Sequence, residues 1–281
     1  MTQIKIGGVP EHFNYPWHLC LEESAFSNAN IELQWTDFHG GTGEMSQALK
    51  EGEIDLAIML TEGSVKEIAD GSPFKILQTY VQSPLMWGIH VDAKSKFEKL
   101  ESLEGKTAAI SRFGSGSHLM TYVNADQNNW ETKELKFETT QNLYGAVEAL
   151  SNGEADYFMW EHFTTKPLVD RGIFRWLGNQ PTPWPCFVLV STNHFIEANS
   201  ERINKLLEII NRKTNEFKSI DGITQKIAEK YQLKYTDVSK WLSKTEWSQT
   251  QINEEDLMNA QDKLMELKLI NKGLNYSDYI A

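Results

Sequence analysis

The stretch Glu51-Gly52-Glu53-Ile54-Asp55 returns as Asn152-Gly153-Glu154-Ala155-Asp156, 101 residues further along the chain. One offset that holds over about 25 residues predicts two lobes that are built alike. The alternative is chance agreement in a loop rich in Gly, Glu and Asp. The same offset aligns further positions on both sides: Ala48 with Ala149, Leu49 with Leu150, and Gly71 with Gly172.

Apolar strands and amphipathic helices alternate around both copies. Asp55–Leu60 is nearly continuously apolar, as in a parallel strand covered on both faces, and Asp156–Trp160 repeats this character. Alternating strands and helices predict an α/β fold. Further strands are expected at Ile4–Val9, Ile31–Trp35, Lys106–Ser111 and Lys136–Glu138, and helices at Trp17–Ser24, from the 39–43 turn to Lys50, and at Tyr144–Asn152.

Two segments read as crossings between the lobes. Phe74–Val91 contains Pro84 and Gly88, which favours two extended segments joined by a bend. Three prolines at 181, 183 and 185 precede the strand-like stretch Cys186–Val190. We therefore expect one lobe from residues 1–86 and 187–281, and the other from 87–186. Beyond residue 199 the pattern is helical and indicates packing helices.

The composition argues against several classes of protein, among them nucleic-acid-binding, membrane-spanning and metal-binding proteins. Among 281 residues, 39 acidic against 27 basic side chains give a net charge of −12, which argues against nucleic-acid binding. Apolar runs are too short for a membrane span. Two cysteines do not make a disulfide framework or a thiolate site, and no histidine pair has the helical spacing of a zinc site. We expect no metal and no cofactor. Because the first residues lack the features of a secretory leader, we expect a cytoplasmic protein, or a periplasmic one if a leader was removed.

The negative charge is concentrated at the start of the chain. Residues 1–72 hold twelve acidic against three basic side chains, whereas residues 73–200 hold 14 against 11. A solubilising surface is the plain interpretation. Only Arg112, Arg171 and Arg175 occur before residue 200, so each is informative about anion binding.

Several motifs resemble those of type II periplasmic binding proteins. They are Ile6–Pro10, the glycine turn at 40–43, the stretch Gly52–Ala57, and Gly105–Ile110 followed by a Gly/Ser turn. Over residues 4–200 the chain looks most like the sulfonate, taurine and nitrate binding proteins and the thiamine pyrimidine-precursor group. Unlike the fungal pyrimidine-synthesising relatives, it has no cysteine cluster.

The resemblance implies a two-lobed α/β fold, each lobe a mixed sheet flanked by helices. It also implies that the lobes close by a hinge on a small-molecule ligand in the cleft between them. An ABC permease would be the partner of an exported protein.

The Gly/Ser turn Ser111-Arg112-Phe113-Gly114-Ser115-Gly116-Ser117 is the strongest local feature. Backbone N–H groups, hydroxyl groups and a helix N-terminus favour anions there, and Arg112 could pair with a carboxylate, sulfonate or phosphate. The alternative is an ordinary Ser-capped helix with an exposed Arg. For the turn at 39–43 the alternative is a tight strand-to-helix connection, and for each Trp it is packing. The candidate ligand contacts are Pro10, His12 and Trp17; Gly40, Gly41 and Thr42; Thr61, Glu62 and Ser64; Trp87 and Trp184; Ser111, Arg112, Phe113, Gly114, Ser115 and Ser117; and Trp160, Glu161 and His162.

Signs of catalysis are weak. No G-x-S-x-G nucleophile elbow is present. Glu161 and His162 are the right types for an acid–base pair, but neighbours on a strand point to opposite faces. We predict a binding protein for an anionic or heteroaromatic organic ligand, with no catalytic residues. The alternative is a cytoplasmic enzyme on the same fold, such as a menaquinone-pathway-like lyase or synthase.

Overall fold

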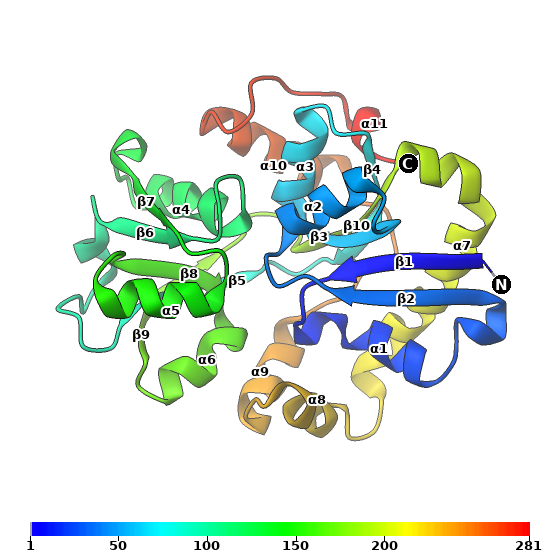
Figure 1. Cartoon of the computed structure of the whole chain (residues 1–281), viewed down its shortest axis with the longest axis horizontal. Coiled ribbons are helices and arrows are strands. Elements are labelled where there is room, and N and C mark those ends of the chain that lie inside the picture. The colour runs from blue at the N-terminus through cyan, green and yellow to red at the C-terminus, as the bar shows by residue number, and fades with distance from the viewer. Residues whose placement is uncertain (1) are drawn as a thin grey trace. The chain divides into compact units, whose positions relative to one another are not determined.

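A computed structural model describes residues 2–281, and these divide into two compact units (Figure 1). Unit 1 contains the residues up to Pro84, together with Trp184–Met265 and Ile270–Ala281. Unit 2 contains Leu85–Pro183 and the short segment Glu266–Leu269. Each unit is built around one five-stranded mixed sheet.

The sheet of unit 1 has the strand order β2-β1-β3-β10-β4. Strands β1, β2 and β3 are parallel, and β10 runs antiparallel to both of its neighbours. Every side chain of β3 is buried, as its apolar sequence predicts. The strands are β1 (Thr2–Gly8), β2 (Ile31–Asp37), β3 (Leu56–Leu60), β4 (Phe74–Val81) and β10 (Phe187–Thr192).

The sheet of unit 2 has the order β7-β6-β8-β5-β9, which is the same arrangement. Its three parallel strands are β6, β7 and β8, and β5 runs antiparallel to β8 and β9. Strand β5 therefore takes the position in this sheet that β10 takes in the other. The strands are β5 (Met86–Asp92), β6 (Thr107–Ile110), β7 (Lys136–Thr139), β8 (Tyr157–Glu161) and β9 (Phe174–Pro181).

Helices flank both sheets, so the α/β fold class is confirmed. Within residues 2–281, no helix combines the length and the apolar character that crossing a bilayer demands. The helices of unit 1 up to β4 are α1 (Tyr15–Glu22), α2 (Thr42–Glu51) and α3 (Thr61–Ala69). Those of unit 2 are α4 (Gly116–Gln127), α5 (Leu143–Asn152) and α6 (His162–Asp170).

The 101-residue offset is matched by the boundaries of three consecutive elements. Helices α2 and α5, strands β3 and β8, and helices α3 and α6 begin and end 101 residues apart. Gly52 caps the C-terminus of α2 and Gly153 that of α5, both in the left-handed backbone conformation, with φ values of 71° and 74°. The predicted internal repeat is thus confirmed, and chance agreement is not needed to explain the sequence match.

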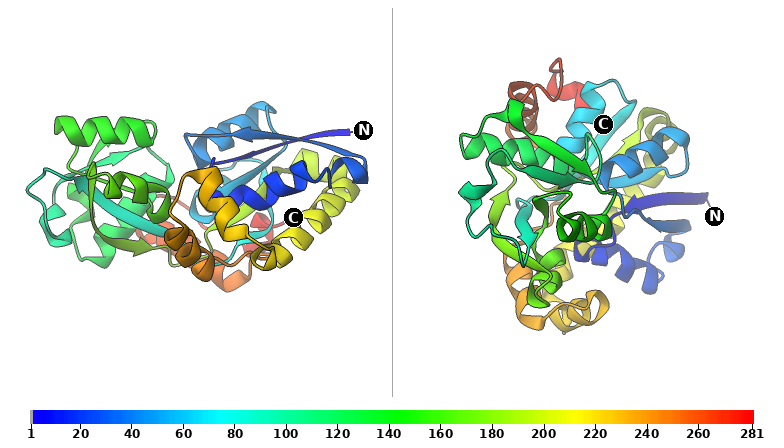
Figure 2. Two further views of the ribbon diagram at one scale, coloured as in Figure 1. Left: turned by 90° about the horizontal axis from the view of Figure 1, so that it is seen from below. Right: turned by 60° about the vertical axis from the view of Figure 1, so that its left-hand side comes forward.

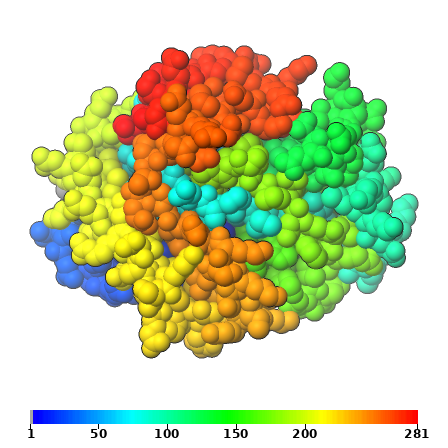
Figure 3. Space-filling view, turned by 180° about the vertical axis from the view of Figure 1, so that it is seen from behind, coloured from blue at the N-terminus to red at the C-terminus, as the bar shows by residue number. Residues whose placement is uncertain are grey.

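The C-terminal helices complete unit 1. Helix α7 packs beside α1 (Figure 2), and α7 to α11 cover one face of this unit in yellow to red (Figure 3). Ile203, Leu206 and Ile210 of α7 are buried on one face, as predicted. These helices are α7 (Asn193–Glu216), α8 (Ile223–Tyr231), α9 (Tyr235–Lys244), α10 (Glu254–Glu266) and α11 (Tyr276–Tyr279).

The repeat predicts equal costs for equivalent glycine substitutions. At Gly52 and Gly153 an added Cβ would meet nothing within 4 Å, so the left-handed backbone alone opposes it. Gly52→Ala and Gly153→Ala should each lower the free energy of unfolding by about 1 kcal/mol. Urea denaturation measures both.

Gly178→Ala is the matched control. Its Cβ also enters open space, but its φ is not in the left-handed region. Its free energy of unfolding should stay within about 0.5 kcal/mol of the wild type. A loss at Gly178 as large as at Gly52 would contradict the conformational explanation.

Candidate functional site

In each unit, three parallel strands end at one edge of the sheet, where α/β proteins place their ligands. In unit 1 these are the ends of β1, β2 and β3, and in unit 2 those of β6, β7 and β8. Most of the predicted contacts follow one of these strands. They therefore fall into two groups, one at the edge of each sheet.

The turn after β2 is locked to the end of β3. The hydroxyl of Thr42, the first residue of α2, accepts a hydrogen bond from Leu60 N at 3.0 Å. Gly41 has a φ of 71°, and the Glu44 carboxylate accepts from Gly40 N at 2.6 Å. The tight-connection alternative is thus correct for the conformation of this turn. Its half-buried glycine backbone still lies at the sheet edge.

Glu62 is a fully buried carboxyl group in the first turn of α3. Its Oε2 atom accepts a hydrogen bond from the Trp184 indole at 2.7 Å. Among the described residues, neither Glu62 Oε1 nor the hydroxyl of Thr61 has a hydrogen-bond partner. Burial raises the pKa of Glu62 to about 7. The Ser64 hydroxyl instead donates to the carbonyl oxygen of Leu60, the last residue of β3.

His12 and Trp17 are buried in aromatic clusters, and the prediction that they contact a ligand stays a prediction. Trp17 is fully enclosed and stacks on Phe26. The His12 ring packs at 4.2 Å, between centroids, against Trp241 of α9. Burial lowers the pKa of His12 to about 3, so the imidazole is neutral at physiological pH. Pro10, two residues before His12 in the sequence, is half-buried.

The Gly/Ser turn of unit 2 connects β6 to α4, as predicted, but its serines are directed inward. Ser117 Oγ accepts from Ser111 N at 3.0 Å, and Ser115 caps the helix by accepting from His118 N. All three serines are buried. These hydroxyl groups shape the turn, and the expectation that they serve as ligand donors stays a prediction.

The outer side of that turn carries the remaining candidates. Arg112 is half-buried, and Phe113 is 66% exposed. Gly114 has a φ of 82°, which lets the chain double back, and its N–H donates to His118 Nδ1 at 3.1 Å. No acidic residue lies in the first turn of α4. The positive end of the helix dipole therefore has no intrahelical anion to offset it.

A second turn of unit 2, between β7 and α5, was missed by the sequence analysis. Gln141 N donates to Ser111 O at 3.0 Å and thereby joins the two turns. Asn142 caps α5, and Tyr144 is 79% exposed. The repeat offset pairs Gln141–Tyr144 with Gly40–Gly43, so the internal repeat could have revealed this turn.

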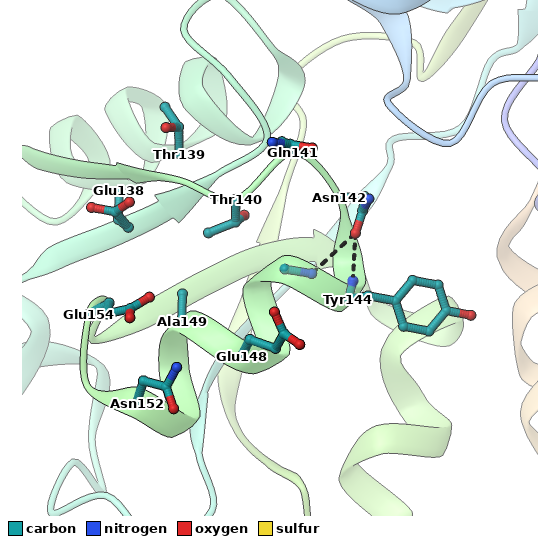
Figure 4. A pocket seen from close by; sticks show the side chains of 11 residues that line it. Glu138, Thr139, Thr140, Gln141, Asn142, Tyr144, Glu148, Ala149, Asn152 and Glu154 are labelled. Atoms are coloured by element: carbon teal, nitrogen blue, oxygen red, sulfur yellow. Dashed lines mark hydrogen bonds between the residues drawn. The ribbon is translucent and has the colours of Figure 1, made fainter.

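A polar hollow of about 510 Å³ lies against β7 and α5 (Figure 4). Three carboxylates line it, those of Glu138, Glu148 and Glu154, together with Asn152. Figure 4 shows the Tyr144 ring directed away from Glu138 and Glu154. No group of three potential metal ligands occurs within residues 2–281. Because three carboxylates line the hollow, it does not have the character of an anion site.

The third turn of unit 2 holds Glu161 at the end of β8. Glu161 Oε2 accepts from Thr164 N at 2.6 Å and from Thr164 Oγ1 at 2.9 Å, which caps α6. Burial raises the pKa of Glu161 to about 7. The half-buried His162 packs on Trp176 instead. The capping role of the carboxyl group gives the Glu161–His162 acid–base pair no support.

The tryptophan candidates are mainly packing residues. Trp87 and Trp184 are both almost completely buried, which favours the packing alternative, and their contact with a ligand stays a prediction. Trp160 is half-buried and lies edge-on to Trp87, with ring centroids 6.3 Å apart. Phe113, on the turn that precedes α4, and Tyr144, in the first turn of α5, are more exposed than any of these tryptophans.

Comparisons with known proteins establish the fold. Residues 87–179, a third of the chain and all within unit 2, match the sequence profile of the Ca3427-like PBP family. The Candida albicans CA3427 gene product superimposes with a TM-score of 0.89 at 22% identity, covering 98% of this chain and 92% of its own. It is described as defining a family with the generic periplasmic binding protein structural fold. No curated protein matches the chain.

Two sulfonate-binding proteins share the same fold over the whole chain. The alkanesulfonate-binding protein SsuA of Xanthomonas axonopodis pv. citri, bound to MOPS, has a TM-score of 0.84 at 16% identity, covering 100% of this chain and 98% of its own. The aliphatic sulphonate binding protein SsuA of Escherichia coli has a TM-score of 0.73 at 17% identity, covering 100% and 97%. This chain thus has the two-lobed periplasmic-binding-protein fold that its sequence motifs indicate.

The buried Glu161 carboxyl group predicts a pH dependence of stability. Its folded-state pKa of about 7 lies above the ordinary value of 4.5, so the folded protein retains a proton that the unfolded chain has released. This contribution to stability is therefore lost as pH rises from 4.5 to 7. Between pH 5 and pH 8 the free energy of unfolding should decrease less in Glu161→Gln than in the wild type. The difference between the two decreases should exceed about 1 kcal/mol. Urea unfolding at both pH values measures this difference.

Glu148→Gln is the control, because it removes an exposed carboxyl group from the same unit. It should leave the pH dependence of unfolding as in the wild type. Identical pH dependence in wild type and Glu161→Gln would refute the assignment of a raised pKa.

Proposed function

We propose that this protein is a substrate-binding protein that closes its two lobes around a small organic anion, as binding proteins of ABC importers do. The observation that carries the proposal is the electrostatic character of the α4 N-terminus. Its first turn has no acidic residue, its cap is a neutral serine, and Arg112 precedes it. Such a helix end attracts negative charge, and a guanidinium group adds bidentate hydrogen bonds.

The other helix ends at the two sheet edges support this choice of anion site. In unit 1 the first turns of α2 and α3 already carry Glu44 and Glu62. In unit 2 the α6 N-terminus is capped by Glu161, whereas α5 has only the neutral Asn142. The first turn of α1 also lacks an acidic residue, but no arginine occurs before residue 112. The turn before α5, which is hydrogen-bonded to the turn before α4, lines the hollow with three carboxylates. The α4 N-terminus, preceded by Arg112, is thus the one best suited to an anion.

The organic part of the ligand would meet aromatic and polar groups. Phe113 and Tyr144 expose their rings on the two joined turns, and aromatic faces favour an organic group over a bare inorganic ion. In unit 1, Glu62 Oε1 and the Thr61 hydroxyl lack partners among the described residues and are available to a polar ligand group. We propose Thr61, Glu62 and Arg112 as ligand contacts.

The similar proteins favour a sulfonate as the anion. The Xanthomonas and Escherichia coli proteins are described as binding alkanesulfonates or aliphatic sulphonates, and the former holds MOPS. By this proposal the partner of the protein is an ABC permease. The cellular location stays a prediction, as does the absence of an enzymatic activity.

Arg112→Ala tests the anion site. Removal of a charge-assisted hydrogen bond should weaken binding by about 1.5–3 kcal/mol, or roughly 10–150-fold in Kd. Native mass spectrometry of untreated protein first identifies any co-purified small molecule. Isothermal titration calorimetry then measures its affinity, and that of MOPS, for wild type and variant.

Arg171→Ala is the matched control, because Arg171 follows α6 and its Nε donates to Pro167 O on an exposed surface. It should change Kd less than twofold, consistent with the small effects of surface substitutions. Equal, small losses in the two variants would remove the case for an anion site at Arg112. Heat evolved beyond stoichiometric saturation, with formation of a product, would favour the enzyme alternative.

A further inference from the structure

The chain passes between the two units after Pro84 and after Pro183, and these two passages are hydrogen-bonded to each other within each unit. In unit 1, Cys186 N donates to Ser83 O at 3.2 Å. In unit 2, Thr182 N donates to Leu85 O at 3.0 Å, and Leu85 N donates to Thr182 Oγ1 at 2.9 Å. The units change at Pro84 and at Pro183.

The junction at 183–185, the sequence Pro-Trp-Pro, has few backbone donors. Pro183 and Pro185 have no N–H group, so they cannot donate to either sheet. Trp184, the residue between them, is almost completely buried. Its indole N–H donates to Glu62 Oε2 at 2.7 Å, a contact between residues 122 positions apart. This bond therefore fastens the junction where the backbone does not.

Glu62 is held in a fixed position by the packing of α3. Thr61 N donates to Cys186 O at 3.1 Å, which ties the start of the helix to the returning chain. A Cβ at Gly63 would lie only 2.6 Å from Thr42 Cγ2, so α3 packs closely against α2. If Trp184 moved, Glu62 could stay hydrogen-bonded to it only through a shift of α3. Such a shift would disturb the contacts of Thr61 with Cys186 and of Gly63 with Thr42.

The Glu62 carboxyl group has no ion-pair partner among the described residues, because the charged groups of the neighbouring elements are engaged elsewhere. Strands β3 and β10 carry no charged residue. The other elements that pack most extensively against α3 are α2 and β4. Their charged side chains, and the remaining ones of α3, bond as follows: Glu44 to Gly40 N, Lys50 to Glu67, Glu51 to Gln47, Lys66 to Asp70, and Lys75 to the carbonyls of Ser277 and Asp278.

We infer that Glu62 is a proton-sensitive anchor of the junction at residues 183–185. When ionised, its carboxylate holds the Trp184 indole by a charge-assisted hydrogen bond. When protonated, it holds the indole by a weaker neutral bond, and the junction gains freedom. The pKa of about 7 places both forms near neutrality. This inference goes beyond the proposed function because it concerns the chain junction, which Glu62 Oε2 holds, whereas the proposed ligand contact of Glu62 is through Oε1.

The indole N–H of Trp184 reports directly on the anchor. In ¹H–¹⁵N spectra of the dialysed full chain, its resonance should move to lower field as pH rises from 5 to 9, with a midpoint near 7. Trp184→Phe assigns the signal. In Glu62→Gln the resonance should stay near its low-pH position at every pH. Glu161→Gln removes an equally buried carboxyl group from unit 2 and should leave the Trp184 titration unchanged.

A second measurement does not depend on the folding of Glu62→Gln. The side-chain ¹³C carboxyl resonance of Glu62 can be titrated in wild type and in Trp184→Phe. Loss of the indole donor, which stabilises the ionised form, should raise the midpoint by about one pH unit. A Trp184 resonance that does not titrate in the wild type, or a Glu62 midpoint unaffected by Trp184→Phe, would overturn the inference. Neither result depends on whether the protein binds an anion.

Discussion

Asp55 exchanges two hydrogen bonds with the backbone of Lys5. Lys5 N donates to Asp55 Oδ2, and Asp55 N donates to Lys5 O, both at 2.8 Å. Asp156 forms the same pair with Thr107 in unit 2. Each aspartate thereby sets where the buried central strand begins beside its parallel neighbour. Since a slip of one residue would turn every side chain of that strand to the opposite face, both sheet edges depend on these two carboxylates. The positions of Glu62 and Glu161 follow, because α3 and α6 start where the strands end.

The elements were predictable from the sequence because their signals are local. The apolar run at β3 lies in the strand that it indicates, and the repeat compares two segments that each carry their own local pattern. The packing of His12 was not predictable, because its neighbour Trp241 comes from a helix near the other end of the chain. For the same reason the sequence does not reveal that Trp184 meets Glu62. The serines at 111, 115 and 117 were identified correctly as a turn. Their hydroxyls point inward because the turn itself needs hydrogen-bond acceptors for Ser111 N and His118 N.

The two units share a topology but differ in the charges at their sheet edges. In unit 1 the first turns of α2 and α3 carry carboxyl groups, in keeping with the excess of twelve acidic over three basic residues in the first 72 positions. Unit 2 leaves the ends of α4 and α5 to neutral caps, and it keeps its buried carboxyl group, Glu161, on α6. The repeat thus preserved the backbone, while the chemistry of equivalent turns diverged. A single architecture therefore offers a ligand two surfaces of different polarity.

The placement of β5 and β10 also determines the order in which the chain can fold during synthesis. All five strands of the unit 2 sheet lie between Met86 and Pro181, so this sheet is complete as soon as that segment has left the ribosome. The sheet of unit 1 lacks the strand between β3 and β4 until Phe187–Thr192 has emerged, although β1 to β4 are synthesised first. Its aromatic core then waits longer still, for Trp241. The middle of the protein is consequently the first part able to reach its native state, and the N-terminal strands must be kept from pairing wrongly until their missing neighbour arrives.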